Sequence, residues 1–197
     1  MSKEPESGVK LWWVILGAVA MVSIPPLLAV AAKAVAMSTD SHACVIEIAS
    51  YWPEEQHWRT ARVYGDGRLE VRDTVTKNQA DAMKQFSLQL TAEELAEIWS
   101  EVVSSGLFEF SNERAASKER ATGRARPLFS EPAPTDFTIS SIDEASSERA
   151  ERVAKFHLTY GGAEHLAYPE IAEYAAANRL SIRLLSAKAP ACDGCAQ

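Results

Sequence analysis

The sequence predicts an α+β fold, in which a mainly antiparallel sheet carries two helices on one face and follows an N-terminal transmembrane helix. Three observations support this prediction. The chain begins with a long apolar segment, it continues with stretches that alternate apolar and polar residues as half-buried strands do, and it contains two stretches with apolar residues at helical spacing. After the apolar segment, the predicted order of elements is four strands, a helix, two strands and a helix.

The apolar segment, residues 11–36, has two interpretations. As a helix with a rise of about 1.5 Å per residue, its uncharged part up to Ala32 is long enough to cross a hydrocarbon core of about 30 Å. Trp12, at its start, suits the membrane interface. In the second interpretation the segment is a cleaved signal peptide, because Pro25-Pro26 breaks a helix and small residues follow it. We expect the retained anchor.

The rest of the chain divides into three parts under that expectation. Residues 1–10 form a cytoplasmic N-terminus, residues 40–188 form one extracytoplasmic domain, and residues 189–197 form a flexible tail. A domain of this length buries a hydrophobic core without help from disulfides. The formal net charge of −7 argues against general nucleic-acid binding, which needs a basic surface. The expected partners are membrane lipid, along residues 11–36, and another protein.

The first four strands are predicted by β-forming residues and by turns. Cys44–Tyr51 is rich in β-branched and aromatic residues. Arg59–Tyr64 and Arg68–Thr74 flank Gly65-Asp66-Gly67, whose residues tolerate the positive φ angles of a tight hairpin turn. The stretch Phe86–Leu90 alternates apolar and polar residues, so it is the fourth strand.

The first helix is the most strongly indicated element. Thr91 and Glu94 have the spacing of a capping box, and Gly106 suits the position just beyond the end of the helix. We expect its apolar face, with the large ring of Trp99, to pack on the apolar face of the sheet. The residues at helical spacing on this face are Leu95, Ile98, Trp99, Val102 and Val103.

Two more strands and a second helix are predicted after residue 134. Thr135–Ile142 and Ala154–Tyr160 are β-forming stretches, separated by a polar turn. Pro169 then suits the first turn of a helix, where its missing N–H costs nothing. The residues expected to form the buried face of this helix are Ile171, Tyr174, Ala175, Ile182 and Leu185.

Residues 111–134 show no apolar periodicity and carry several arginines, so they are predicted to be a basic loop. One interpretation is a contact for anionic lipid headgroups or for an acidic partner. The other, which we favour, is a solvated and mobile insertion in the domain.

Four stretches together suggest a family resemblance: "VYGDGRLEV", "LTAEELAEIWSEVVSSGLFEF", "PTDFTISS" and "YPEIAEYAAANRLSIRLL". Over about residues 44–186 they resemble a group of uncharacterised α+β domains found in bacterial lipoproteins and membrane-anchored envelope proteins. The resemblance implies the fold and an envelope location, which we expect to be the bacterial inner membrane, with a single span and the domain facing the periplasm or exterior. It implies no catalytic residues.

The three cysteines, Cys44, Cys192 and Cys195, leave several alternatives open. They could form one disulfide, within the C-terminal pair or to Cys44, or the C-terminal pair could be an inert tail. A metal site needs about four ligands, which His42 and Cys44 would complete only if the two ends of the domain meet. We expect neither a metal nor a cofactor.

The sequence lacks the motifs of common hydrolases, metalloproteases and nucleotide-binding enzymes. An aromatic group formed by Trp52, His57 and Trp58 is a candidate partner contact, because tryptophan is enriched in binding hot spots. The expected function is therefore that of a non-enzymatic, membrane-anchored envelope domain that binds a protein, as an accessory subunit of a membrane assembly. The alternative is a small exported redox or metal-binding protein that uses Cys192 and Cys195.

Overall fold

The computed structural model describes residues 35–76, 82–125, 133–143 and 151–189. Most of the predicted anchor and the whole of the C-terminal CxxC lie outside these residues. The last two residues of the predicted anchor, Val35–Ala36, are a short strand, β1, which pairs with the end of the sixth strand. The sheet therefore includes the last two residues of the predicted anchor. No helix among the described residues is long and apolar enough to cross a membrane.

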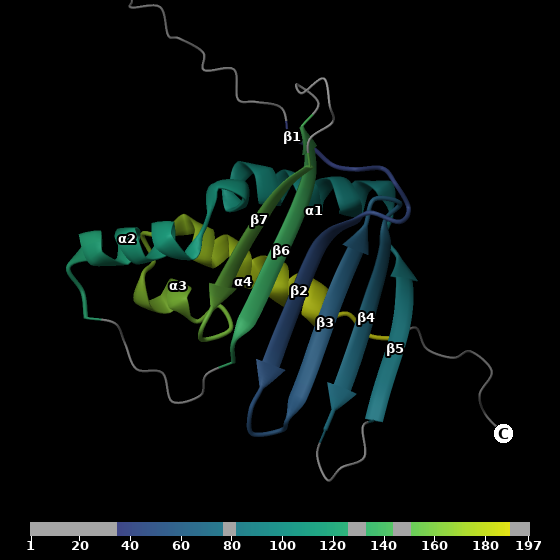
Figure 1. The fold of residues 1–197 in the computed structure, drawn as a ribbon, viewed down its shortest axis with the longest axis horizontal. Helices are drawn as coiled ribbons and strands as arrows, with labels where there is room; N and C mark the ends of the chain where they lie inside the picture. Colours follow the sequence, from purple (N-terminus) through teal and green to yellow (C-terminus); the bar gives the residue numbers. More distant parts are fainter. Residues whose placement is uncertain (1–34, 77–81, 126–132, 144–150, 190–197) are drawn as a thin grey trace, which may run out of the picture. The chain divides into compact units, whose positions relative to one another are not determined.

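The described strands form one antiparallel sheet, as the sequence predicts, with helices beside it (Figure 1). Six longer strands have the spatial order β7-β6-β2-β3-β4-β5, and the short β1 is paired with β6. Their bounds are Cys44–Trp52 (β2), His57–Tyr64 (β3), Arg68–Val75 (β4), Ala82–Gln89 (β5), Thr135–Asp143 (β6) and Glu151–Leu158 (β7).

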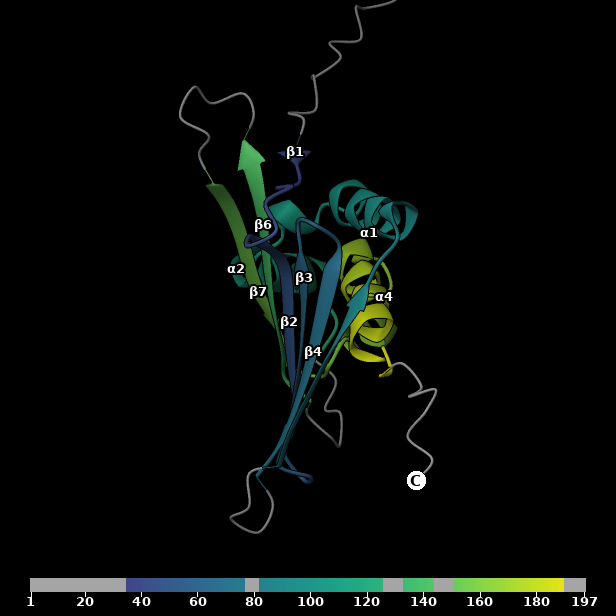
Figure 2. The ribbon, with the colours of Figure 1, turned by 90° about the vertical axis from the view of Figure 1, so that its right-hand side faces the viewer.

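Two helices, α1 (Ala92–Ser104) and α4 (Ala172–Leu185), pack on the same face of the sheet (Figure 2). We call this face the inner face and the opposite one the outer face. The register places Ile46 opposite Val63, and Ile48 opposite Ala61, so that these fully buried side chains share the inner face. Because side chains alternate along a strand, the residues between them point to the outer face, which is largely polar.

The ends of α1 confirm the capping prediction. The Thr91 hydroxyl accepts a hydrogen bond from the Glu94 N–H (3.1 Å), and the Glu94 carboxylate accepts one from the Thr91 N–H (2.8 Å). Gly106 has a φ angle of 75°, which glycine adopts without strain, and the chain then turns into the short 3₁₀ helix η2, Leu107–Glu109.

The predicted buried face of α1 is right except at one edge. Leu95, Ile98 and Val102 are buried, and Trp99 is half-buried, with its ring edge-to-face on Phe108 at 5.3 Å. Val103 was expected on the same face but is 41 % exposed. With about 100° of rotation per residue, Val103 lies farthest from the centre of the apolar stripe and faces solvent.

The prediction for α4 is less accurate. The helix begins at Ala172 rather than at Pro169, and Ile182, expected to be buried, is 58 % exposed. The stripe that meets the sheet contains small residues, which let the helix approach closely and which a search for large apolar side chains overlooks. Its buried members are Tyr174, Ala176, Ala177, Leu180, Ser181 and Leu184.

The prediction of a basic loop over residues 111–134 is wrong for its first half, which forms the helix α2, Asn112–Thr122. The Ser111 hydroxyl caps this helix by accepting from the Arg114 N–H, and Gly123 ends it with a φ angle of 67°. Only one of its residues, Ala115, is buried, so the sequence shows no apolar period. Polar contacts to α4 hold it instead.

Those contacts use charges that the sequence suggested were solvated. Lys118 forms an ion pair with Glu173, and the Tyr174 hydroxyl donates to the Glu119 carboxylate at 2.6 Å. A short helix, α3 (Glu164–Ala167), lies between β7 and α4 in the chain. The resulting arrangement places α2 and α3 near the β7 edge, while α1 and α4 cover the middle of the inner face (Figure 1).

Candidate functional site

The helices do not cover the whole length of the inner face. Strands β2 to β5 continue past α1 and α4 at the end of the sheet that carries the β2–β3 turn, which we call the distal end (Figure 2). Strand β1 lies at the other end, because it pairs with Ile142 and Asp143, whereas the distal end of β6 is Thr135. At about 3.4 Å per residue, some 25 Å of strand separate these positions.

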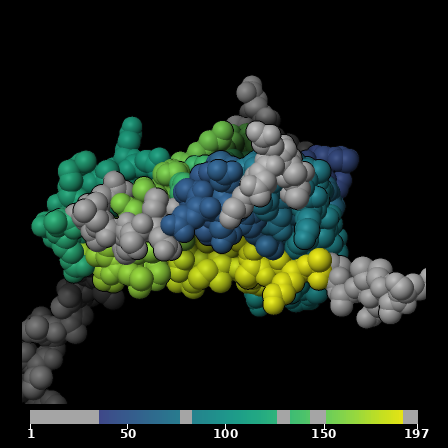
Figure 3. All heavy atoms as spheres, turned by 90° about the horizontal axis from the view of Figure 1, so that it is seen from below, coloured from purple at the N-terminus to yellow at the C-terminus, as the bar shows by residue number. Residues whose placement is uncertain are grey.

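A groove lies where the distal end of the inner face meets the last turns of α4, and we call it the distal groove. Its volume is about 440 Å³. Seen from below, the β2–β3 hairpin and α4 lie side by side in this region (Figure 3). The residues that line the groove come from four parts of the chain: Ser50, Trp52, His57, Arg59, Ala133, Tyr160, Gly161, Ser181, Ile182, Leu185 and Ser186.

The structure divides the predicted aromatic cluster between the two faces of the sheet. Trp52 and His57 are paired across the β2–β3 hairpin, stack at 5.1 Å on the inner face and line the distal groove. Trp58, the third predicted member, stacks instead on Tyr51 at 4.5 Å and is 43 % exposed. The split follows from the two-residue period of a strand, since neighbouring residues point to opposite faces.

A charged network that the sequence analysis did not find forms one end of the groove wall. Nε2 of His57 lies 2.9 Å from Oδ1 of Asp73, and Nη1 of Arg59 lies 3.4 Å from the other oxygen of the same carboxylate. Arg59 also donates to the carbonyl oxygen of Ala187, just after α4. The network therefore ties the end of α4 to β3 and β4 and fixes the orientation of the His57 ring.

On the side of the groove opposite this charged network, a buried carboxylate holds the chain in place. Glu164 is only 2 % exposed, and its two oxygens accept the N–H groups of Tyr160 (2.9 Å) and Gly162 (3.1 Å). Gly161, between them, has a φ angle of 63°, and a side chain there would meet the carbonyl oxygen of Ala133 at 3.1 Å. The loop from β7 to α3 thus lies close against residue 133.

The histidine and one buried serine that line the groove are each bonded to another residue. The hydrogen-bond partner of His57 is Asp73, and the buried Ser50 hydroxyl is bonded to the Thr135 hydroxyl at 2.9 Å. A serine nucleophile would instead be bonded to the histidine that activates it. Within the described ranges, no group of three or more histidine, cysteine, aspartate or glutamate residues is placed to hold a metal ion.

Two of the weak metal candidates, His42 and Cys44, lie at the end of the sheet away from the groove. Cys44 is a free thiol that starts β2 and donates to the carbonyl oxygen of Ile46 at 3.4 Å. Burial, with a smaller contribution from nearby Glu47, raises the pKa of the Cys44 thiol from 9.0 to about 11. His42 is exposed, and Cys192 and Cys195 lie outside the described residues. Because its thiol is harder to deprotonate than an exposed one, Cys44 is a weaker nucleophile.

Comparison of the chain with protein-family models and with curated proteins finds no match.

Proposed function

We propose that this protein is a non-enzymatic, membrane-anchored envelope domain that binds another protein through the distal groove, as an accessory subunit of a membrane assembly. The observation that carries the proposal is the groove itself. It is a hollow, open to solvent, where the last turns of α4 meet the uncovered end of the inner face.

The composition of the groove supports a protein ligand. Its volume of about 440 Å³ is within the range of sites that take a few side chains or a small molecule. Trp52 and Arg59 are residue types that carry much of the binding energy at protein interfaces. The stacked Trp52 and His57 rings and the Arg59–Asp73 ion pair are already in place, so little side-chain freedom is lost when a partner binds.

The predicted anchor agrees with this role. If residues 11–36 include a membrane span, the chain enters the domain at β1, and the groove lies at the far end of β6. The proposed partner is then an extracytoplasmic protein. The family resemblance to envelope domains, taken as part of this proposal, favours the same location.

The alternative of a redox or metal-binding protein receives no support from Cys44. Its thiol has a raised pKa, and it starts β2 at the end of the sheet away from the groove.

The test is copurification of the full-length protein from its native membrane in a mild detergent. Ser186 lines the groove and is exposed, so Ser186→Trp fills the groove without removing a buried contact. Leu166→Trp is the matched control, because Leu166 is 71 % exposed on α3 and is not a groove residue. We expect a specific partner with the wild-type protein and with Leu166→Trp, and its loss with Ser186→Trp. Retention of the partner by Ser186→Trp at the wild-type level would refute the assignment to the groove.

A further inference from the structure

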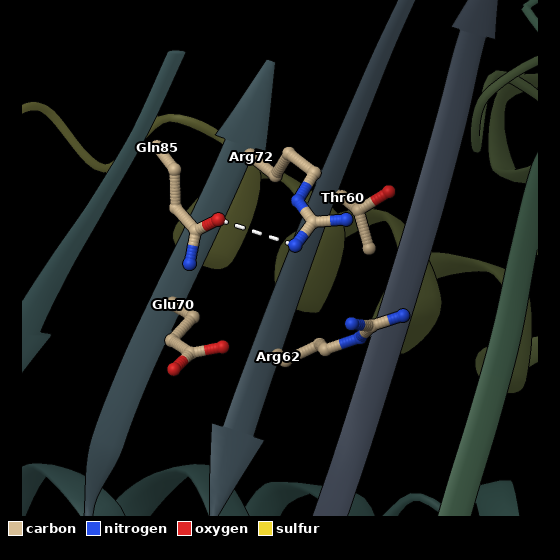
Figure 4. A pocket seen from close by; sticks show the side chains of 5 residues that line it. All are labelled: Thr60, Arg62, Glu70, Arg72 and Gln85. Atoms are coloured by element: carbon tan, nitrogen blue, oxygen red, sulfur yellow. Dashed lines mark hydrogen bonds between the residues drawn. The ribbon is translucent and has the colours of Figure 1, made fainter. Parts of the chain in front are cut away.

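The outer face of the sheet carries a second, smaller hollow, which we call the outer hollow. It is about 40 Å³ in volume, so it has room for one small polar group but not for a ring or a cofactor. Figure 4 shows its five side chains, which come from three neighbouring strands. They are Thr60, Arg62, Glu70, Arg72 and Gln85.

Each side-chain carboxylate and amide oxygen in and beside the outer hollow already accepts a hydrogen bond. One oxygen of Glu70 pairs with Arg68, and the other accepts from the Tyr64 hydroxyl at 3.0 Å. Glu47, next to the hollow on β2, accepts from both Nε and Nη2 of Arg62, at 3.0 and 3.4 Å. The carbonyl oxygen of the Gln85 side chain accepts from Arg72 at 3.2 Å (Figure 4).

By contrast, several hydrogen-bond donors of the outer hollow make no hydrogen bond to the residues that the structure describes. Arg72 makes no ion pair with any carboxylate in the part of the chain that the structure describes, and its bond to Gln85 uses only one of its nitrogens. Within the same residues, Nη1 of Arg62, the amide nitrogen of Gln85 and the Thr60 hydroxyl make no hydrogen bond. A guanidinium group has five N–H donors and no acceptor, so the groups left over in this hollow are mainly donors.

The local charge has the same sign as this excess of donors. Three guanidinium groups, those of Arg62, Arg68 and Arg72, lie beside the two carboxylates of Glu47 and Glu70. One positive charge is therefore left without a counter-charge, in a protein whose formal net charge is −7. A ligand with a single negative charge balances it, whereas a dianion such as phosphate would bring an excess negative charge close to Glu47 and Glu70.

We propose that the outer hollow is a binding site for a carboxylate group, with Arg72 as its main charged contact. The guanidinium of Arg72 donates to the carboxylate, and Arg62, Gln85 and Thr60 supply further donors around it. Charge-assisted hydrogen bonds of this kind are the strong ones, and arginine suits them because its planar fork matches a carboxylate. The site lies on the opposite face of the sheet from the distal groove and does not depend on the function proposed for that groove.

The surface next to the hollow indicates what the rest of the ligand would touch. Trp58 lies two residues before Thr60 on β3, so both point to the outer face about 7 Å apart along the strand. The Trp58 ring is stacked on Tyr51 and exposed. A carboxylic acid with an apolar part could therefore place its carboxylate at Arg72 and its apolar part on Trp58.

The experiment is an NMR titration of the full-length protein in mild detergent, observing the side-chain N–H signals of Arg72 and Gln85. The probes are sodium acetate, sodium phosphate, the capped peptide Ac-Ala-Glu-Ala-NH₂ and its neutral counterpart Ac-Ala-Gln-Ala-NH₂. We expect saturable shifts with acetate, weaker binding of phosphate, and no saturable shift with the glutamine peptide. Saturation by the glutamate peptide as well would identify a protein side chain as a possible source of the carboxylate, and its absence would identify a small free acid.

Two variants make the result specific. Arg72→Gln should abolish the saturable shift of Gln85 or weaken the binding at least tenfold, while the melting temperature stays unchanged because Arg72 is exposed. Arg183→Gln, an exposed arginine on α4 that pairs with Glu97, is the control and should bind acetate as the wild type does. The proposal is overturned if acetate gives no saturable shift, if Arg72→Gln binds as tightly as the wild type, or if phosphate binds more tightly than acetate.

Discussion

The two ends of the inner face are built from the same strands but have opposite chemistry. Toward the end that carries β1, the inner face of β2, β3 and β6 is fully buried, with residues such as Ile46, Val63 and Ile139. At the distal end the same strands present Trp52, His57 and Arg59. The change from apolar to polar coincides with the place where helix coverage ends, so the distal side chains contribute less to the core.

This comparison predicts a large difference in stability between substitutions at the two ends. Phe137 is buried under the helices and stacked on Phe156 at 4.6 Å, so Phe137→Ala should lower the free energy of unfolding by about 3–5 kcal/mol. Trp52 is half-buried and its main ring contact is with His57, so Trp52→Ala should cost only about 1 kcal/mol. Urea denaturation of the two variants measures both values. Equal losses would mean that the distal end is part of the core.

Trp99 should give an intermediate value. Its ring packs against Phe108 but is partly exposed, so Trp99→Ala should cost about 2–3 kcal/mol, less than a fully buried ring. The matched control is Val103→Ala on the solvent side of the same helix, which should change the free energy of unfolding by less than about 0.5 kcal/mol. If Val103→Ala destabilised the protein as much as Trp99→Ala, the orientation of α1 described here would be incorrect.

The cap of α1 should have a smaller effect. Thr91→Ala removes the hydroxyl that accepts from the Glu94 N–H, and should lower the free energy of unfolding by about 1 kcal/mol. Hydrogen bonds to Thr91, chiefly from its backbone N–H, lower the pKa of the Glu94 carboxyl. The stability that the ionised carboxylate contributes is therefore fully present above the pKa of the unfolded chain, and it is lost as the pH falls through the pKa of the folded protein. The difference between wild type and Glu94→Gln should therefore shrink in acid. A thermal melt series from neutral to acidic pH checks this.

Cys44 allows a test that changes no folded contact. Because burial raises the pKa of its thiol to about 11, alkylation of the folded protein by iodoacetamide should stay slow at pH 9 and accelerate only as pH approaches 11. The urea-unfolded chain should react readily near pH 9. The measurement uses a variant with Cys192→Ser and Cys195→Ser, so that Cys44 is the only thiol. Rapid alkylation of the folded variant at pH 8 would contradict the burial of Cys44 at the start of β2.

Local patterns in the sequence were sufficient for much of the fold. The turn at Gly65–Gly67, the alternation along β4 and the Thr91–Glu94 cap each involve neighbouring residues, so the chemistry that determines them is visible in a short stretch. Helix α2 was missed because its stability comes from contacts with α4, such as Lys118 with Glu173, and not from an apolar face of its own.

The distal groove was only half predictable. Trp52 and His57 were identified by residue type, but Trp58 was grouped with them although a strand places it on the opposite face. Arg59 could have been found by continuing the alternation of β3 for two more residues beyond His57. The hydrogen bond from Arg59 to the carbonyl oxygen of Ala187 joins residues that are 128 positions apart in the chain. It could not have been predicted, since no local pattern encodes a contact between β3 and the end of α4.

The most direct test of the central claim is site-specific photo-crosslinking of the full-length protein in its native membrane. A photoreactive phenylalanine would replace either Trp52, in the distal groove, or Val103, which is 41 % exposed on the helix-covered part of the domain. The account predicts a discrete cross-linked product from position 52, absent from position 103 and lost from position 52 when Ser186→Trp fills the groove. Cross-linking from position 103 alone, or cross-linking from position 52 that Ser186→Trp does not affect, would contradict the claim that the distal groove binds the partner.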